Sequence, residues 1–153
     1  MSDAEATTTI EADPGKVYDL VSDLPRMGEW SPENTGGRWV GGATAARVGA
    51  RFRGTNRRGV LRWATTCEVT DATPGTRFAF DVTYGPVRIS RWEYTFEPDG
   101  GGCRVTESWT ERRPSWMKLG SVPVMAVADR AKHNRRTMEQ TLAALKVAAE
   151  AGS

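Results

Sequence analysis

The chain has 153 residues, a formal net charge of +2, one histidine and two cysteines. This length indicates a single domain, residues 1–153, that can bury a core without a structural metal or disulfide. The near-neutral charge argues against a nucleic-acid partner held by phosphate neutralisation, and the isolated Cys67 and Cys103 argue against a zinc site, so we expect no nucleic acid, metal or other cofactor.

The first predicted elements are a strand and two short helices. β-Branched residues indicate a strand over residues 7–11. Asp13 suits a helix N-cap and Pro14 suits the first helical position, so a helix should follow at once and end before Pro25. A second short helical turn is expected over residues 26–30. The apolar residues of the first helix share one face: Val17, Leu20, Val21 and Leu24.

A long series of strands follows, because the apolar period changes to two. Turn residues with hairpin chemistry separate these segments, and Gly100, Gly101 and Gly102 form one such turn rather than a phosphate-binding loop. Connections this short predict an antiparallel meander. The six strands are expected at 37–41, 50–57, 60–72, 76–84, 87–97 and 103–111.

The last predicted element is a long C-terminal helix. After Pro123 no proline or glycine occurs until Gly152, and apolar residues recur at helical spacing. His133 lies off this stripe, on a face that we expect at the surface. Asn134 is the polar interruption of the stripe and the residue expected nearest a cavity. The apolar members are Val127, Ala131, Met138, Leu142, Leu145 and Ala149.

The sequence shows neither a membrane span nor a secretory signal. No uncharged apolar run approaches the roughly 18 residues of a membrane helix, and residues 1–9 lack the basic-then-apolar order of a signal peptide. We therefore expect a cytoplasmic protein, and the sequence leaves its oligomeric state open.

The order of elements and three local stretches resemble a known superfamily. The stretches are Ile10-Glu11-Ala12-Asp13-Pro14, Met27-Gly28-Glu29-Trp30-Ser31-Pro32 and Arg104-Val105-Thr106-Glu107-Ser108-Trp109. They look like a small bacterial member of the polyketide cyclase/dehydratase and lipid-transport superfamily, whose helix-grip fold is shared with START-type lipid-transfer domains and birch-pollen-allergen-like proteins. The resemblance implies an α+β fold in which a curved seven-stranded antiparallel sheet wraps around the C-terminal helix. It also implies a pocket between them, but the superfamily contains both enzymes and carriers.

Strand alternation predicts which side chains face that pocket. Charged residues identify the outer face, so the uncharged alternate positions point inward. Trp30, Trp116 and Met117 flank the sheet, where they either rim the entrance or cover the ends of the core. The predicted pocket residues are Asn56, Trp63, Phe80, Trp92, Tyr94 and Trp109, with Asn134 from the helix.

Glu107 is the one carboxylate that alternation places inside. A buried carboxylate is costly unless it is protonated or paired. Glu107 is therefore either a polar anchor or general acid/base in an aromatic pocket, or a residue that bonds a wall partner such as Asn56 or Tyr94, or one that water reaches at the open end.

Three functions remain open on this evidence. The leading hypothesis is binding of a small hydrophobic ligand, such as a lipid, a polyketide or an aromatic compound. The second is a cyclase/dehydratase-type enzyme in which Glu107 removes a proton next to a carbonyl while Tyr94 or Asn56 stabilises the enolate oxygen. The third is a protein or RNA interaction module that uses the convex sheet face. The charged residues expected there are Arg51, Arg53, Arg62, Arg77, Arg91 and Arg104, interleaved with Glu68, Asp81 and Glu93.

Overall fold

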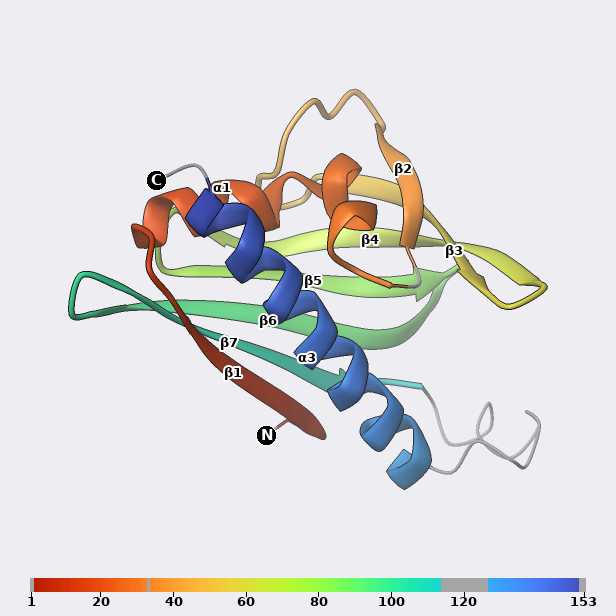
Figure 1. The fold of residues 1–153 in the computed structure, drawn as a ribbon. Coiled ribbons are helices and arrows are strands. Elements are labelled where there is room, and N and C mark those ends of the chain that lie inside the picture. The colour runs from red at the N-terminus through yellow and green to blue at the C-terminus, as the bar shows by residue number, and fades with distance from the viewer. Residues whose placement is uncertain (1, 33, 114–126, 152–153) are drawn as a thin grey trace.

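The computed structural model describes residues 2–32, 34–113 and 127–151 (Figure 1). Its elements follow one another in the predicted order. They are β1 (Ala4–Ile10), α1 (Pro14–Ser22), the 3-10 helix η1 (Leu24–Glu29), β2 (Asn34–Val40), β3 (Arg51–Arg58), β4 (Leu61–Thr73), β5 (Arg77–Tyr84), β6 (Val87–Asp99), β7 (Gly102–Glu111) and α3 (Val127–Ala151).

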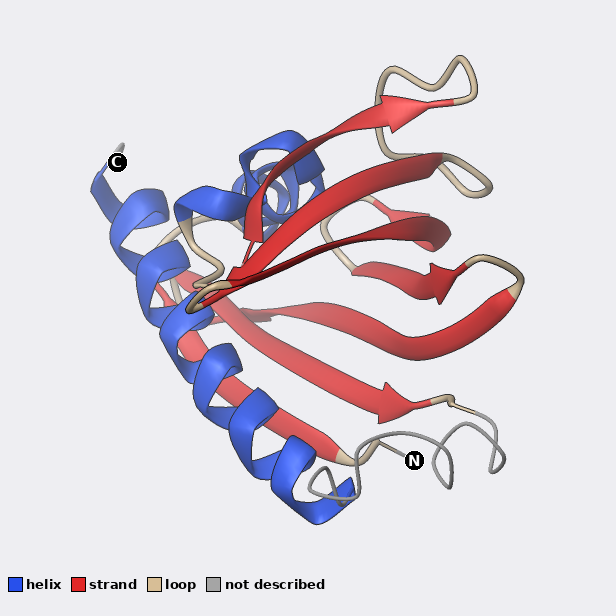
Figure 2. Ribbon diagram, turned by 90° about the vertical axis from the view of Figure 1, so that its right-hand side faces the viewer, coloured by secondary structure: helices blue, strands red, loops and turns tan. Residues whose placement is uncertain are grey.

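The strands form one antiparallel sheet in the order β1-β7-β6-β5-β4-β3-β2. The sheet is strongly curved, and the described helices α1, η1 and α3 lie on its concave side (Figure 2). This arrangement confirms the helix-grip prediction. Figure 1 shows α3 crossing the sheet obliquely, with α1 beside its C-terminal end.

The element bounds differ from the sequence-based expectation mainly at the first two strands, and β2 begins at Asn34 rather than residue 37. β1 begins at Ala4 rather than residue 7, because Ala4 pairs with Trp109 and Glu5 pairs with Ser108 on β7. The composition around Ala4 and Glu5 does not predict a strand. These residues become part of β1 because they pair with the edge of β7. The α1 boundaries agree with the capping signal, since the Asp13 carboxylate accepts a hydrogen bond from the Gly15 backbone N–H.

A densely packed core occupies the end of the concave space beneath α1. Tyr18 of α1 packs edge-on against Phe78 and Phe96, with ring centroids 6.2 Å and 5.8 Å apart. Leu145 of α3 is buried in the same cluster. Trp30 is also buried there, with the Arg26 guanidinium 5.3 Å from its ring centroid, so it covers the core instead of rimming an entrance. Trp116 and Met117 lie outside the described residues, as does the side chain of Val127.

The apolar stripe of α3 faces the sheet as expected. Met138, Leu142, Leu145 and Ala149 are all buried. Met138 contacts a second, smaller cluster that contains Ala4 and Trp109. Each half of α3 therefore packs against the sheet through a separate apolar cluster.

We predict that Met138→Asp destabilises the protein by about 3–5 kcal/mol, because it buries a charge without a partner. Denaturant unfolding measures the effect. Gln140→Asp is the matched control, since Gln140 is exposed on the same helix, and it should change the unfolding free energy by no more than about 0.5 kcal/mol. Equal stability of the two variants would show that α3 does not dock through Met138.

Candidate ligand cavity

A cavity of about 210 Å³ lies between the sheet and the N-terminal half of α3. Strands β3 to β7 supply most of its wall, and η1, β2 and α3 close it. All eight residues singled out from the sequence are among those lining it: Asn56, Trp63, Phe80, Trp92, Tyr94, Glu107, Trp109 and Asn134.

Strand register stacks these side chains in rungs across the concave face. Phe80, Trp92 and Trp109 stand directly opposite one another on β5, β6 and β7. The next rung contains Tyr94 opposite Glu107. Directly opposed side chains on one sheet face lie about 4.5–5.5 Å apart at their Cβ atoms, so the aromatic rung forms a continuous wall and the polar rung lies immediately beside it.

Several lining residues were not identified from the sequence. Thr137 and Thr141 line the cavity, and their helical spacing from Asn134 is a signal that could have found them. Ser90 shares the inward period of Trp92 and could also have been found. Met27, Ser31 and Asn34 have no such signal, because they come from η1, the turn after it and the first residue of β2. The other lining residues are Met27, Ser31, Asn34, Ser90, Thr137 and Thr141, along with Phe52, Gly54, Thr65, Cys67, Val82 and Ile89 on strands β3 to β6.

Glu107 is the buried acid of the cavity wall, with 3% of its surface exposed. The Tyr94 hydroxyl donates a hydrogen bond to Glu107 Oε2 at 2.7 Å. Glu107 Oε1 is buried and has no partner among the described residues. Desolvation raises the pKa of Glu107 to about 8, and the bond from Tyr94 partly opposes that rise. The carboxyl is therefore mostly protonated at neutral pH.

The position of that proton follows from the hydrogen bond. Since Oε2 accepts from Tyr94, the proton of the neutral acid belongs on Oε1, the oxygen without a partner. A protonated carboxyl is a hydrogen-bond donor. Glu107 at neutral pH thus offers the cavity a donor that no described residue accepts.

The other polar groups of the wall differ in how far they are already engaged. Asn56 donates to the Thr65 hydroxyl at 3.4 Å. The hydroxyls of Thr137 and Thr141 donate to helix carbonyls four residues earlier, at 3.1 Å and 2.9 Å. The Asn134 amide and the Ser90 hydroxyl make no hydrogen bond with a described residue, so they are available to a ligand together with Glu107.

The cavity opens toward the hairpin end of the sheet. Trp63 lines it and is nevertheless 40% exposed. Val82 and Ile89, which flank the β5–β6 hairpin, also line it. The opposite end is blocked by the core around Tyr18 and Phe78. Entry must therefore pass beside the β3–β4 and β5–β6 hairpins.

The two cysteines, Cys67 and Cys103, do not form a disulfide with each other. Both are free and buried. Burial raises the pKa of the Cys67 thiol, which lines the cavity, to about 12, so the thiolate is scarce at neutral pH. Within the described ranges no cluster of three His, Cys, Asp or Glu side chains could hold a metal ion, and no helix has the length and hydropathy needed to cross a bilayer.

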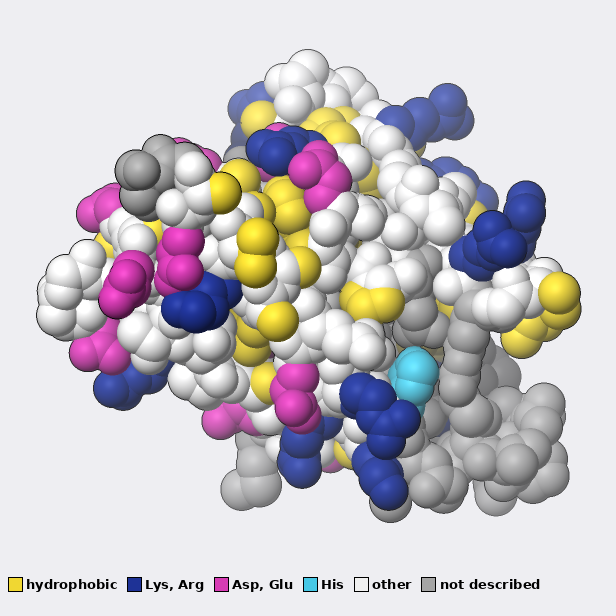
Figure 3. Space-filling view, viewed as in Figure 1, with side chains coloured by type: hydrophobic (Ala, Val, Ile, Leu, Met, Phe, Trp, Pro, Cys, Tyr) yellow, Lys and Arg dark blue, Asp and Glu magenta, His cyan; other side chains and the backbone are white. Residues whose placement is uncertain are grey.

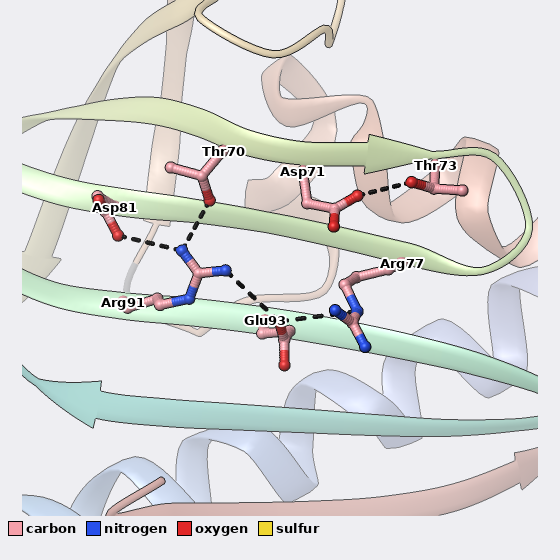
Figure 4. A network of polar contacts seen from close by, with 7 residues as sticks. All are labelled: Thr70, Asp71, Thr73, Arg77, Asp81, Arg91 and Glu93. Atoms are coloured by element: carbon pink, nitrogen blue, oxygen red, sulfur yellow. Dashed lines mark hydrogen bonds and ion pairs between the residues drawn. The ribbon is translucent and has the colours of Figure 1, made fainter. Parts of the chain in front are cut away.

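The middle of the convex face carries a network of paired charges. Over β5 and β6, Arg91 lies 3.6 Å from Asp81 and 3.5 Å from Glu93, and it donates a hydrogen bond to the Thr70 hydroxyl at 2.8 Å (Figure 4). Arg77 approaches Glu93 from the other side at 3.8 Å. This network neutralises the middle of the convex sheet.

We predict that stability falls as pH rises between about 4.5 and 8, because the folded protein holds a proton on Glu107 that the unfolded chain releases near the ordinary pKa of 4.5. The full span corresponds to roughly 4–5 kcal/mol. Glu107→Gln should abolish this slope in denaturant unfolding, whereas Glu139→Gln, at an exposed helix position, should retain it. An unchanged slope in Glu107→Gln would contradict the buried protonated acid.

We also predict that Tyr94→Phe raises the pKa of Glu107 further. The variant removes the hydrogen bond that favours the carboxylate and leaves the desolvation in place. Carbon-detected NMR titration of the Glu107 carboxyl measures the change. A lower pKa in the variant would mean that water enters and replaces the lost hydroxyl.

Comparisons with known proteins agree with this fold. The family profile described as polyketide cyclase/dehydrase and lipid transport matches residues 1–150. The solution structure of the polyketide-cyclase-like protein Cgl2372 from Corynebacterium glutamicum is 32% identical, with a TM-score of 0.65 over 95% of this chain and 90% of that one.

Two more distant structures share the fold alone. The di-domain aromatase/cyclase StfQ of the steffimycin biosynthetic pathway is 16% identical, with a TM-score of 0.72 over 97% of this chain and 51% of that one. Ara h 8.0201 is 14% identical, with a TM-score of 0.69 over 96% of both chains. No curated protein matches the sequence. Since the profile spans nearly the whole chain, the protein belongs to the polyketide cyclase/dehydrase and lipid-transport family.

Proposed function

We propose that the protein binds a small, mostly apolar ring compound that carries an acceptor oxygen, with Glu107 as the polar anchor. The family and fold support a hydrophobic-ligand or cyclase-type role in general. The observation that carries the finer proposal is the buried Glu107 Oε1, which lines an aromatic cavity and has no described partner.

The cavity limits the ligand's size and shape. At about 210 Å³ it is smaller than the roughly 300–1,000 Å³ of pockets that enclose drug-sized ligands. A ligand of one or two rings would fit, or a longer one that projects past Trp63. The rung of Phe80, Trp92 and Trp109 favours flat rings, which stack or pack edge-on against aromatic walls.

The anchor determines which polar group the ligand presents. A neutral Glu107 donates, so the complementary group is a carbonyl, ether or other acceptor oxygen. A carboxylate ligand would also accept this bond, but it would lose its hydration in an apolar cavity without a cationic partner. An uncharged ligand is therefore favoured.

Catalysis is the second candidate, and the Tyr94–Glu107 pair is the observation that favours it. A carboxyl with a pKa of about 8 is suited to proton transfer near neutral pH. Enolate formation also needs a donor for the developing oxyanion. Tyr94 already donates to Glu107, and Asn56 already donates one N–H to Thr65. The donors left for that task are Asn134, Ser90 and the second N–H of Asn56. The binding role needs no such second group and is the simpler reading.

We predict that filling the cavity blocks binding. Ser90 is buried and lines the cavity, so Ser90→Phe should weaken binding of the uncharged probe 2-naphthol at least about tenfold, a loss of about 1.4 kcal/mol. Quenching of tryptophan fluorescence measures it, since Trp63, Trp92 and Trp109 line the site. Ser108→Phe places the same ring on the convex side of β7 and should leave affinity unchanged. Equal effects of both variants, or no naphthol binding by the parent, would contradict the proposal.

A further prediction separates carrier from enzyme. Glu107→Gln keeps the size of the side chain and a donor but removes proton transfer. If the protein is a carrier, Glu107→Gln should bind naphthol within about fivefold of the parent, or about 1 kcal/mol. Deprotonation of Glu107 should weaken naphthol binding by the parent above pH 8, and the variant should not show this weakening. If the parent exchanges the α-protons of a cyclic ketone with solvent deuterium and Glu107→Gln does not, the catalytic candidate replaces the carrier.

A further inference from the structure

The segment from β2 to the first half of β4, residues 34–67, carries positive charge and no acidic residue. From Asn34 to Cys67 the sequence contains no aspartate or glutamate but includes a third of the chain's 21 Lys plus Arg residues. Among the described side chains of this stretch, Arg51 alone forms an ion pair with a described carboxylate, that of Glu68 at 3.7 Å. The arginines are Arg38, Arg47, Arg51, Arg53, Arg57, Arg58 and Arg62.

Strand register places like charges directly opposite each other in this segment. Arg57 on β3 stands opposite Arg62 on β4, and Arg38 on β2 stands opposite Arg53 on β3. All four residues are exposed. Opposed like charges destabilise a sheet, in contrast to the compensated network around Arg91 on the same face. Repulsion between the opposed arginines therefore lowers the stability of the fold, and an external anion bound between them would relieve that repulsion.

The tip of the β3–β4 hairpin adds exposed apolar side chains to these charges. Val60 is 96% exposed, Leu61 is 64% exposed and Trp63 is 40% exposed. Alternation puts Leu61 and Trp63 on the concave side of β4 and Arg62 on the convex side. At the right-hand edge of Figure 3, where Figure 1 draws this hairpin, hydrophobic side chains project beside a group of arginines or lysines.

We propose that the β3–β4 hairpin docks on an anionic lipid surface through Val60, Leu61, Arg57 and Arg62. A bilayer presents phosphates and hydrocarbon at adjacent depths, and an apolar tip flanked by cations matches both. RNA or an acidic protein would satisfy the arginines but would leave Val60 and Leu61 without a partner. Trp63 suits the interfacial region, where tryptophan is enriched.

This docking goes beyond ligand binding but would serve it. Trp63 belongs to the hairpin and to the cavity wall, so a docked hairpin brings the open end of the cavity to the lipid surface. An apolar ligand could then pass between membrane and cavity without crossing much water. Arg57, Val60, Leu61 and Arg62 do not line the cavity, so docking through them and ligand binding can each fail without the other.

Flotation with vesicles tests the proposal. The parent should bind vesicles of phosphatidylcholine mixed with phosphatidylglycerol, should not bind phosphatidylcholine alone, and should be released by salt. The double variant Arg57→Gln/Arg62→Gln should bind the mixed vesicles about thirtyfold more weakly, since each arginine near an anionic surface contributes about fivefold. Its thermal midpoint should be unchanged or higher, because the opposed like charges are gone. Its naphthol affinity should be unchanged.

Two controls separate the hairpin from net charge. Arg77→Gln/Arg104→Gln removes the same charge from exposed positions on the same face that already face Glu93 and Asp99, and it should weaken vesicle binding far less. Val60→Ser/Leu61→Ser keeps the arginines and should also weaken binding. The proposal is wrong if the parent does not bind the mixed vesicles, or if the two double arginine variants weaken vesicle binding equally. It is also wrong if the parent binds single-stranded RNA or heparin and Val60→Ser/Leu61→Ser binds vesicles as tightly as the parent.

Discussion

The C-terminal helix leaves part of the concave surface of the sheet unfilled, and the cavity depends on that mismatch. Leu142, Leu145 and Ala149 reach the core at one end. Toward the other end the inward positions of α3 include Asn134, Thr137 and Thr141, which are short and polar. The hydroxyls of Thr137 and Thr141 donate to carbonyls of their own helix instead of to the sheet. The strands curve away faster than these side chains extend, and a cavity remains.

An unfilled space of this kind changes the chemistry of whatever lines it. Glu107 is far enough inside to lose its water, and Tyr94 supplies one hydrogen bond where a solvated carboxylate would have several. The protonated state of Glu107 therefore has the lower free energy at neutral pH. One rung of the wall is therefore aromatic, and the next rung presents a hydrogen-bond donor, the protonated carboxyl of Glu107. This combination would recognise a neutral, oxygen-bearing ring better than a hydrocarbon or an anion.

Much of the fold was predictable because its signals are local. Asp13 and Pro14 mark the start of α1, and the period of two assigned Phe80, Trp92 and Trp109 to one face without knowledge of their partners. The pairing of Tyr94 with Glu107 was considered beside Asn56 but could not be selected, because register depends on how each hairpin closes.

Features that depend on distant partners were not predictable. Ala4 and Glu5 become strand only because β7 offers an open edge, and Asn34 reaches the cavity from the far side of η1. Trp30 had two possible positions until the packing of α1 and η1 against the sheet placed it in the core.

The pairing of β1 with β7 also has a consequence for how the molecule is made. Each of the strands β2 to β6 pairs with the strand next in sequence, whereas Ile10 must pair with Cys103 and Ala4 with Trp109. The entropy of closing so long a loop grows slowly with its length, so the cost in stability is modest, but contacts between distant residues slow folding. On the ribosome the first strand is synthesised well before its partner exists. Because β7 also carries Glu107, the cavity wall is complete only once the beginning of the chain has joined its last strand.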